Sequence, residues 1–536
     1  MELIIDRIDF WGPNGPGRAV RLVAILFASL ATTCAPVAKA PAPSSSSAAS
    51  SAAASPDDPS VVSCGQGPEG LVSSLSSPPD EKPEAPPVPN AEPGEPLRIT
   101  ATAQFEKINL KPDVNSPVIG LFRAGQSVRV KGDGPIPSNE ALSRCSAGWF
   151  AIEPRGYVCP GFRSTQGAPN IRAMAAAEAL PDGSSVMGVR VGVSIGAPIY
   201  LRIPTRAEQR SAERGLDEHL ARDIPPDEAA GGAIDKTPAG AAPSDVLVKY
   251  FDQVKGPLLD KKGAFAGRKV AFTRAFDAEG RTWLLTPDLG LIPKDKVRVK
   301  PVPDLNGVDL RGGGQLPLAF LWLKASPKYV EDASGTPQPT AEMWPRHSFV
   351  PVSAELIRKK TGTFLKARDG MYLRRDAVTV IQASDRRPAG VGPEDKWVGV
   401  RVTHGYLIAY EGNTPVYTTA ISPGMAGVSR TGHATHPGTY TVVWKFRTWR
   451  MSGVDRAEEW IVDEVPFVAF YKGNFALHGA WWHNDFGRPK SHGCVNIPPA
   501  AAQALFSWLE PDLPEDWYGV ASYWPEARGT VIEIRP

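Results

Sequence analysis

Near its C-terminus the chain reads His478-Gly479-Ala480-Trp481-Trp482-His483-Asn484-Asp485-Phe486-Gly487-Arg488-Pro489-Lys490-Ser491-His492-Gly493-Cys494-Val495-Asn496. Cys494 stands among small and polar residues, with His492 two positions before it and His478 sixteen before it. A thiol becomes an effective nucleophile when a base removes its proton, and imidazole suits that role near neutral pH. Gly493 lets a substrate carbonyl approach the backbone, where consecutive N–H groups can stabilise an oxyanion. The alternative is a small buried cysteine in a glycine-rich turn.

The whole pattern resembles the active-site signature of the L,D-transpeptidases, which have a YkuD-type catalytic domain. In that family the signature is His-Gly, a variable loop, Ser/Thr-His-Gly-Cys, an aliphatic residue, and Asn or Arg, and every position has a counterpart here. The resemblance implies that Cys494 is the nucleophile and that His478, oriented by the Gly479 carbonyl, is its base. It also implies that His492 and the backbone amides of Gly493 and Cys494 line the oxyanion hole.

The resemblance further implies a substrate, the peptide stem of peptidoglycan. Cys494 would attack the carbonyl of the diacid at stem position three and expel the terminal D-amino acid. The thioester would then pass to an amine of a second stem, giving a 3→3 crosslink, or to a protein, an amino acid or water. Neither a metal ion nor an organic cofactor is expected.

The loop between the two motif histidines is rich in aromatic residues. We expect Trp481 and Trp482 to form a wall of the substrate groove, with Arg488 or Lys490 near a carboxylate of the stem peptide. The alternative is a self-packed loop in which one tryptophan covers the sheet. The other residues expected to contact substrate are Ser491, Asn496 and Tyr471.

The surrounding segment, residues 396–536, predicts a mostly-β catalytic domain with short helices. Strands are expected at 397–402, 406–410, 416–420, 439–444, 468–471 and 529–534, because these segments are rich in aromatic and β-branched residues between turn signals. Pro498 and Pro499 suit the first turn of a helix over 500–509, where a missing N–H costs nothing.

The N-terminal segment predicts export. Arg18 and Arg21 precede a nine-residue apolar run over 22–30, and small residues lead to Cys34. This is the composition of a secretory signal over residues 1–34, and the cysteine after small residues resembles a bacterial lipoprotein site. We therefore expect a cell-envelope or periplasmic protein, anchored to a membrane through a lipid on Cys34, with plain secretion as the alternative. Residues 35–96, rich in Ala, Ser and Pro, predict a disordered tether.

Three segments between the tether and the catalytic domain predict small β modules. In residues 97–164, Phe122 and Gly125 precede a Val-x-Val strand, and Trp149 and Gly156 lie seven apart. This pattern resembles a bacterial SH3-like barrel. Weaker echoes suggest a second such domain with an inserted loop at 185–300 and a third at 317–388. The expected fold class is thus multidomain and mainly β, with SH3-like barrels before the catalytic domain.

The charge balance and the cysteine content bear on the partners and the compartment of the protein. The 59 basic and 57 acidic side chains nearly cancel, so no nucleic acid partner is indicated. Cys145 and Cys159 flank two expected strands of the first barrel, and we expect them to form a disulfide if the compartment is oxidising. Peptidoglycan, as stem peptides and glycan, is the expected partner.

Three alternatives to a transpeptidase stay open. Transfer of the acyl group to water would make the protein an L,D-carboxypeptidase, and a degenerate site would leave a wall-binding adaptor without catalysis. The third is a zinc-dependent peptidoglycan hydrolase, whose candidate ligands are His433, His436, His478, His483, His492 and Asp485. Glycine and proline around His433 and His436 favour a loop there over a ligand-bearing helix.

Overall fold

The computed structural model describes residues 67–69, 96–136, 145–161, 163–181, 186–221, 241–312, 314–384, 386–426, 432–455, 458–522 and 527–536. The expected signal segment with Cys34, and all of the expected tether except 67–69 and 96, lie outside these residues. Pro68 is buried, and Gly67 lies against the Asn474 side chain, so this piece of the tether packs on the C-terminal domain. No described helix is long and apolar enough to cross a membrane.

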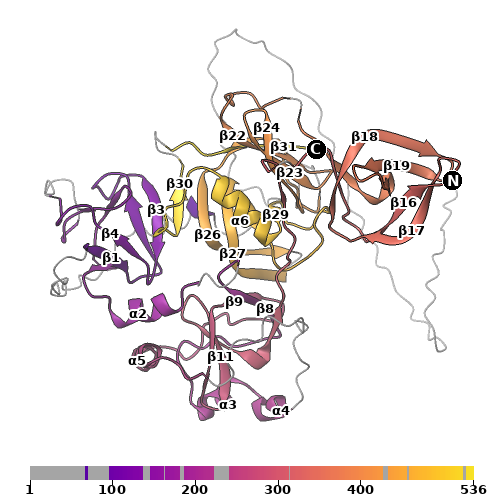
Figure 1. Cartoon of the computed structure of the whole chain (residues 1–536). Helices are drawn as coiled ribbons and strands as arrows, with labels where there is room; N and C mark the ends of the chain where they lie inside the picture. Colours follow the sequence, from indigo (N-terminus) through magenta and orange to yellow (C-terminus); the bar gives the residue numbers. More distant parts are fainter. Residues whose placement is uncertain are drawn as a thin grey trace, which may run out of the picture. The chain divides into compact units, whose positions relative to one another are not determined.

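The C-terminal domain, residues 396–536, consists of two packed sheets and one helix. Its strands are β22 (Lys396–Arg401), β23 (Tyr406–Glu411), β24 (Thr414–Ala420), β25 (Gly438–Thr441), β26 (Trp444–Asp455), β27 (Glu458–Lys472), β28 (Phe475–Gly479), β29 (Val495–Ile497), β30 (Gly519–Ala521) and β31 (Val531–Arg535). The first sheet has the order β14-β24-β23-β22-β31-β25, where β14 (Val308–Asp309) comes from the preceding part of the chain, and β26 to β30 belong to the second. The helix α6 (Pro499–Trp508) packs on β27 and β28 (Figure 1).

The core of this domain lies between the two sheets and α6. Val398 and Leu407 from the first sheet meet Leu477 and Val495 from the second, and Leu505 of α6 packs against them. All five side chains are essentially inaccessible to solvent, so the strand that carries His478 is held from both faces. Burial on both faces also explains why β22 and β23 are nearly continuous apolar runs.

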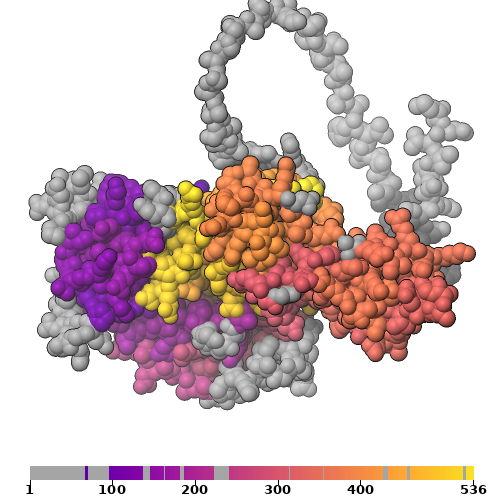
Figure 2. All heavy atoms as spheres, turned by 45° about the horizontal axis from the view of Figure 1, so that its top comes forward, coloured from indigo at the N-terminus to yellow at the C-terminus, as the bar shows by residue number. Residues whose placement is uncertain are grey.

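The first module, residues 97–166, is a set of short antiparallel strands. These are β1 (Arg98–Ala101), β2 (Phe105–Asn109), β3 (Val118–Arg123), β4 (Ser127–Arg129), β5 (Phe150–Ala151), β6 (Tyr157–Val158) and β7 (Ser164–Gln166). Cys145 and Cys159 are joined by a disulfide. Strand β3 pairs with β30 of the C-terminal domain, where Gly120 leaves room for the Trp517 ring. The indigo and yellow atoms that adjoin in Figure 2 are these two parts of the chain.

The second module, residues 171–300, mixes helices and strands. Its helices are α2 (Ile171–Glu178), α3 (Arg206–Ala212), α4 (Leu216–Leu220) and α5 (Asp245–Gln253), with η1 (Lys294–Lys296), and its strands are β8 (Arg190–Ser194), β9 (Lys269–Phe272), β10 (Arg274–Ala278), β11 (Arg281–Leu285), β12 (Leu291–Pro293) and β13 (Val297–Lys300). In the segment where a small barrel with an inserted loop was expected, the short helices α3 to α5 accompany the strands β8 to β13. Thr205 and Glu208 form a capping box that starts α3, and Ser244 caps α5, so side chains satisfy the first free N–H groups.

The third module, residues 317–381, is antiparallel throughout. It contains β15 (Leu318–Phe320), β16 (Ser326–Glu331), β17 (Pro337–Trp344), β18 (Phe349–Lys359), β19 (Gly362–Ala367), β20 (Tyr372–Arg374), η2 (Arg375–Ala377) and β21 (Thr379–Ile381). The short strand β14 (Val308–Asp309), just before it, pairs with β24. Small β structures thus occupy all three predicted segments, and their assignment as SH3-like barrels stays a prediction.

Candidate active site

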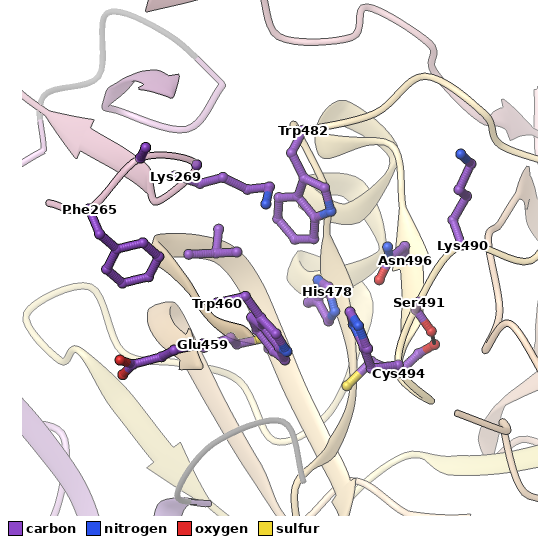
Figure 3. A pocket seen from close by; sticks show the side chains of 15 residues that line it. Phe265, Lys269, Glu459, Trp460, His478, Trp482, Lys490, Ser491, Cys494 and Asn496 are labelled. Carbon is purple, nitrogen blue, oxygen red and sulfur yellow. Dashed lines mark hydrogen bonds between the residues drawn. The ribbon is translucent and has the colours of Figure 1, made fainter. Parts of the chain in front are cut away.

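Cys494 and His478 are brought together by two adjacent strands. Cys494 immediately precedes β29, which runs parallel to β28 with His478 paired to Asn496. Cys494 is 1% exposed, and among the described cysteines it is the one that is not in a disulfide. Its Sγ donates to the backbone carbonyl of Asn474 at 3.6 Å. Both side chains line the same cavity, as Figure 3 shows.

His478 is held in one tautomer and kept neutral. Its Nδ1 lies 3.0 Å from the Gly479 carbonyl oxygen, and because a carbonyl can only accept, Nδ1 carries the proton. The lone pair of Nε2 is therefore available as a base. Burial lowers the pKa of His478 to about 4, against the opposing effect of the Gly479 hydrogen bond. The imidazole is thus uncharged near neutral pH and able to accept a proton.

The turn before Cys494 is fixed by hydroxyl groups. Ser491 Oγ donates to the Cys494 carbonyl and accepts from Gly493 N–H at 3.0 Å, while Thr435 Oγ1 donates to the Gly493 carbonyl at 2.9 Å. Gly493 has φ +124°, and a Cβ there would come within 2.5 Å of the Phe475 ring. Glycine is therefore required by conformation and by space. The Gly493 amide, expected to line an oxyanion hole, is instead engaged by Ser491.

His492 lies at the cavity in contact with aromatic rings. Its imidazole stacks on Trp460 of β27 with centroids 4.9 Å apart, and it meets His433 edge-on at 4.5 Å. His492 thus lines the same cavity as Cys494, and its role in an oxyanion hole stays a prediction. Trp460, which supports it, was not singled out by the sequence.

The cavity has a volume of about 510 Å³ and is built from three separated parts of the chain. It is lined by Phe265, Ala266, Gly267, Lys269, Met451, Glu459, Trp460, Val462, His478, Trp482, Lys490, Ser491, His492, Cys494 and Asn496. Of the predicted substrate-contacting residues, Trp482, Lys490, Ser491 and Asn496 are in this set. The second module and the β26–β27 hairpin supply a wall that sequence reasoning missed.

Three predicted substrate contacts lie elsewhere. Trp481 is 2% exposed and belongs to the hydrophobic core, so the alternative of a tryptophan covering the sheet holds for it. Tyr471 is buried in β27 with its ring 5.3 Å from that of Tyr440. The guanidinium of Arg488 lies 4.3 Å over the Trp322 ring of the third module. These three side chains pack or stack on the protein and do not line the cavity.

The six candidate zinc ligands do not form a site. No three His, Cys, Asp or Glu side chains in the described part of the chain are grouped so that they hold a metal ion. His483 contacts the Asn496 amide at 2.9 Å and accepts from Asp485 N–H at 3.3 Å, so both of its ring nitrogens are already engaged. Burial lowers the pKa of His483 to about 4. The residues present therefore do not fit the zinc alternative.

Comparison with known proteins identifies the C-terminal domain. Residues 395–534 match the model of the L,D-transpeptidase (YkuD) catalytic domain, so this part of the chain is such a domain. No curated protein matches the chain.

Several solved L,D-transpeptidases are similar to parts of the chain. One from Xylanimonas cellulosilytica is 21% identical over 28% of this chain and 64% of its own, with a TM-score of 0.20. The catalytic domain from Enterococcus faecium is 19% identical over 26% of this chain and 98% of its own, with a TM-score of 0.21. One from Mycobacterium smegmatis is 14% identical over 45% of this chain and 89% of its own, with a TM-score of 0.21. The chain thus spans less than two thirds of the Xylanimonas chain.

Proposed function

We propose that the protein is an L,D-transpeptidase that acts on peptidoglycan stem peptides through a thioester on Cys494. The observation that carries this proposal is a buried cysteine thiol, not part of a disulfide, that shares a cavity with a neutral imidazole, inside a domain of the L,D-transpeptidase family. Nδ1 of that imidazole is tied to a backbone carbonyl, so Nε2 is the nitrogen left to act as the base.

In the first half-reaction, Nε2 of His478 removes the proton of the Cys494 thiol. The sulfur attacks the carbonyl carbon of the diacid at stem position three, and the carbonyl electrons move to the oxygen. When the carbonyl re-forms, the bond to the terminal D-amino acid breaks, and its nitrogen takes the proton from Nε2. The products are a thioester on Cys494 and a free D-amino acid.

In the second half-reaction, an amine of another stem attacks the thioester carbonyl. His478 removes the proton of the attacking nitrogen and returns one to the departing sulfur, which restores the thiol. The result is an amide bond between two residues at position three. Attack by water through the same steps would give a tripeptide stem, and thus an L,D-carboxypeptidase. The chemistry requires only these side chains and backbone dipoles.

The test is release of the terminal D-amino acid from a tetrapeptide stem, followed with the full chain. The wild-type chain should release it and form a thioester that intact-mass analysis detects, and Cys494→Ala should do neither. Release should persist in the presence of a strong zinc chelator. An adduct on Cys494→Ala, or activity lost to the chelator and restored by zinc, would overturn the proposal. The ratio of crosslinked dimer to tripeptide separates transpeptidase from carboxypeptidase.

A further inference from the structure

One wall of the active-site cavity comes from the second module, more than 200 residues before the nucleophile. Phe265, Ala266, Gly267 and Lys269 of that module line the same cavity as His478 and Cys494. Lys269 is the first residue of β9 and pairs in parallel with Val462 of the C-terminal domain's β27. Strand pairing thus fixes the backbone of this wall relative to the site.

A buried ion pair holds the wall beside this contact. Arg268, 5% exposed, donates through Nε and Nη2 to the two carboxylate oxygens of Asp463, both at 3.0 Å. Its Nη1 donates to the Gly263 carbonyl at 2.6 Å, and Asp463 also accepts from Arg450 Nε at 2.7 Å. Successive side chains of an extended strand point to opposite faces. With Arg268 directed at Asp463, Lys269 is directed into the cavity, where it reaches toward Trp482 (Figure 3).

The ammonium of Lys269 has no acidic partner among the described residues. The other charged groups that line the cavity are already paired, Lys490 with Asp485 at 3.0 Å and Glu459 with Lys262 at 2.6 Å. Burial alone lowers the pKa of Lys269, with no carboxylate acting against it. A partly buried cation is stabilised when an anion binds beside it, because the pair replaces lost hydration.

We propose that Lys269 is a specificity-determining residue that binds a carboxylate of the acyl-donor peptide, so that the second module completes the substrate site. This rests on the proposed function, whose donor peptide carries two such groups near the scissile bond. One is the terminal carboxylate of the leaving D-amino acid, and the other is the side-chain carboxylate of the diacid at position three. Both offer the same chemistry to an ammonium group.

The test measures KM and kcat for release of the terminal D-amino acid by the full chain. Lys269→Met should raise KM at least about tenfold with little change in kcat, because a lost charge-assisted contact weakens binding without touching the thiol. Lys269→Arg should restore most of the affinity. Lys261→Met, which removes an exposed lysine of the same module, is the matched control and should behave as wild type. Equal melting temperatures would show that the variants are folded.

Peptides in which one of the two candidate carboxylates is replaced by an amide show which carboxylate Lys269 binds. Wild type should lose affinity for the peptide in which the recognised carboxylate is an amide, and Lys269→Met should be insensitive to that same change. An unchanged KM in Lys269→Met, or a wild type indifferent to both amides, would overturn the assignment, and the second result does not depend on a folded variant. A wild-type chain that releases no D-amino acid would overturn the proposed function, and this assignment with it.

Discussion

The two walls of the cavity are built in different ways. The wall that carries Cys494 and His478 consists of neighbouring strands and one turn, held by hydrogen bonds within a single domain. The opposite wall, Phe265 to Lys269, reaches the site through one strand pairing and buried ion pairs between distant segments. In the function proposed above, the first wall holds the groups that make and break bonds, and the second holds groups that contact the substrate. Under that proposal the reactive groups are encoded locally, while recognition is assembled by tertiary structure.

The ion pairs behind the second wall extend through three parts of the chain. Asp288 of the second module accepts from Arg123 of the first module at 2.8 Å and from Arg450 of β26 at 3.0 Å, and Arg123 also donates to Glu464 of β27 at 3.0 Å. Burial opposes ionisation of Asp288, but Arg123 and Arg450 hold its pKa below the usual value. With Arg268 and Asp463, the cluster contains three cations and three anions, so its charges balance.

The largest effect is expected from breaking the first wall. His478→Ala should lower the rate of acylation by roughly 10²–10⁴, the range typical of a general acid–base residue. KM for the tetrapeptide should change little, because the second wall is intact. Pre-steady-state mass analysis of the thioester measures this rate directly. His436→Ala, which alters a histidine that does not line the cavity, is the control, and an equal loss in that variant would contradict the role of His478.

A substitution that loosens the second wall should raise KM and leave kcat largely unchanged. Arg268→Met leaves Asp463 with one cation instead of two, and loss of a buried partner typically costs about 3 kcal/mol of folding stability. We expect a lower melting temperature and a raised KM, with kcat for bound substrate largely kept. Arg298→Met removes an exposed arginine of the same module and should leave both quantities unchanged. A fall in kcat with KM constant would show that this wall serves catalysis instead of recognition.

The smallest expected effect is the contribution of His478, in the first wall, to the pH dependence of folding stability. His478 binds a proton with a pKa near 6.5 in the unfolded chain but about 4 in the folded protein, so acid favours the unfolded state. Its contribution to stability is full above pH 6.5 and is lost as pH falls toward 4, by about 2 kcal/mol at pH 5. Chemical unfolding of wild type and His478→Gln at pH 7.5 and 5 measures this difference. Identical pH dependence in the two proteins would show that His478 is not held neutral by burial.

The sequence predicted the first wall because a motif places Cys494, His478 and Ser491 within seventeen residues. It did not predict Lys269 or Trp460, since nothing local indicates which distant strand will pair with β27. For Trp481 and Trp482 the sequence indicated an aromatic wall but not which of the two side chains faces the cavity. Adjacent residues of an extended chain face opposite ways, so one of them points into the core. The capping box at Thr205 and Glu208 was readable in the sequence, and it marks the start of a helix within the segment 185–300 expected to form a small barrel with an inserted loop.

The pairing of β3 with β30 and of β9 with β27 has a consequence for how the chain must be made. A shortened chain that began at residue 395 would keep the reactive groups but leave two strands of its central sheet with uncovered backbone N–H and C=O groups. Such open edges recruit other chains and promote aggregation. In the full chain β3 and β9 cover these edges, so a chain shortened to begin at residue 395 should aggregate more readily than the full chain.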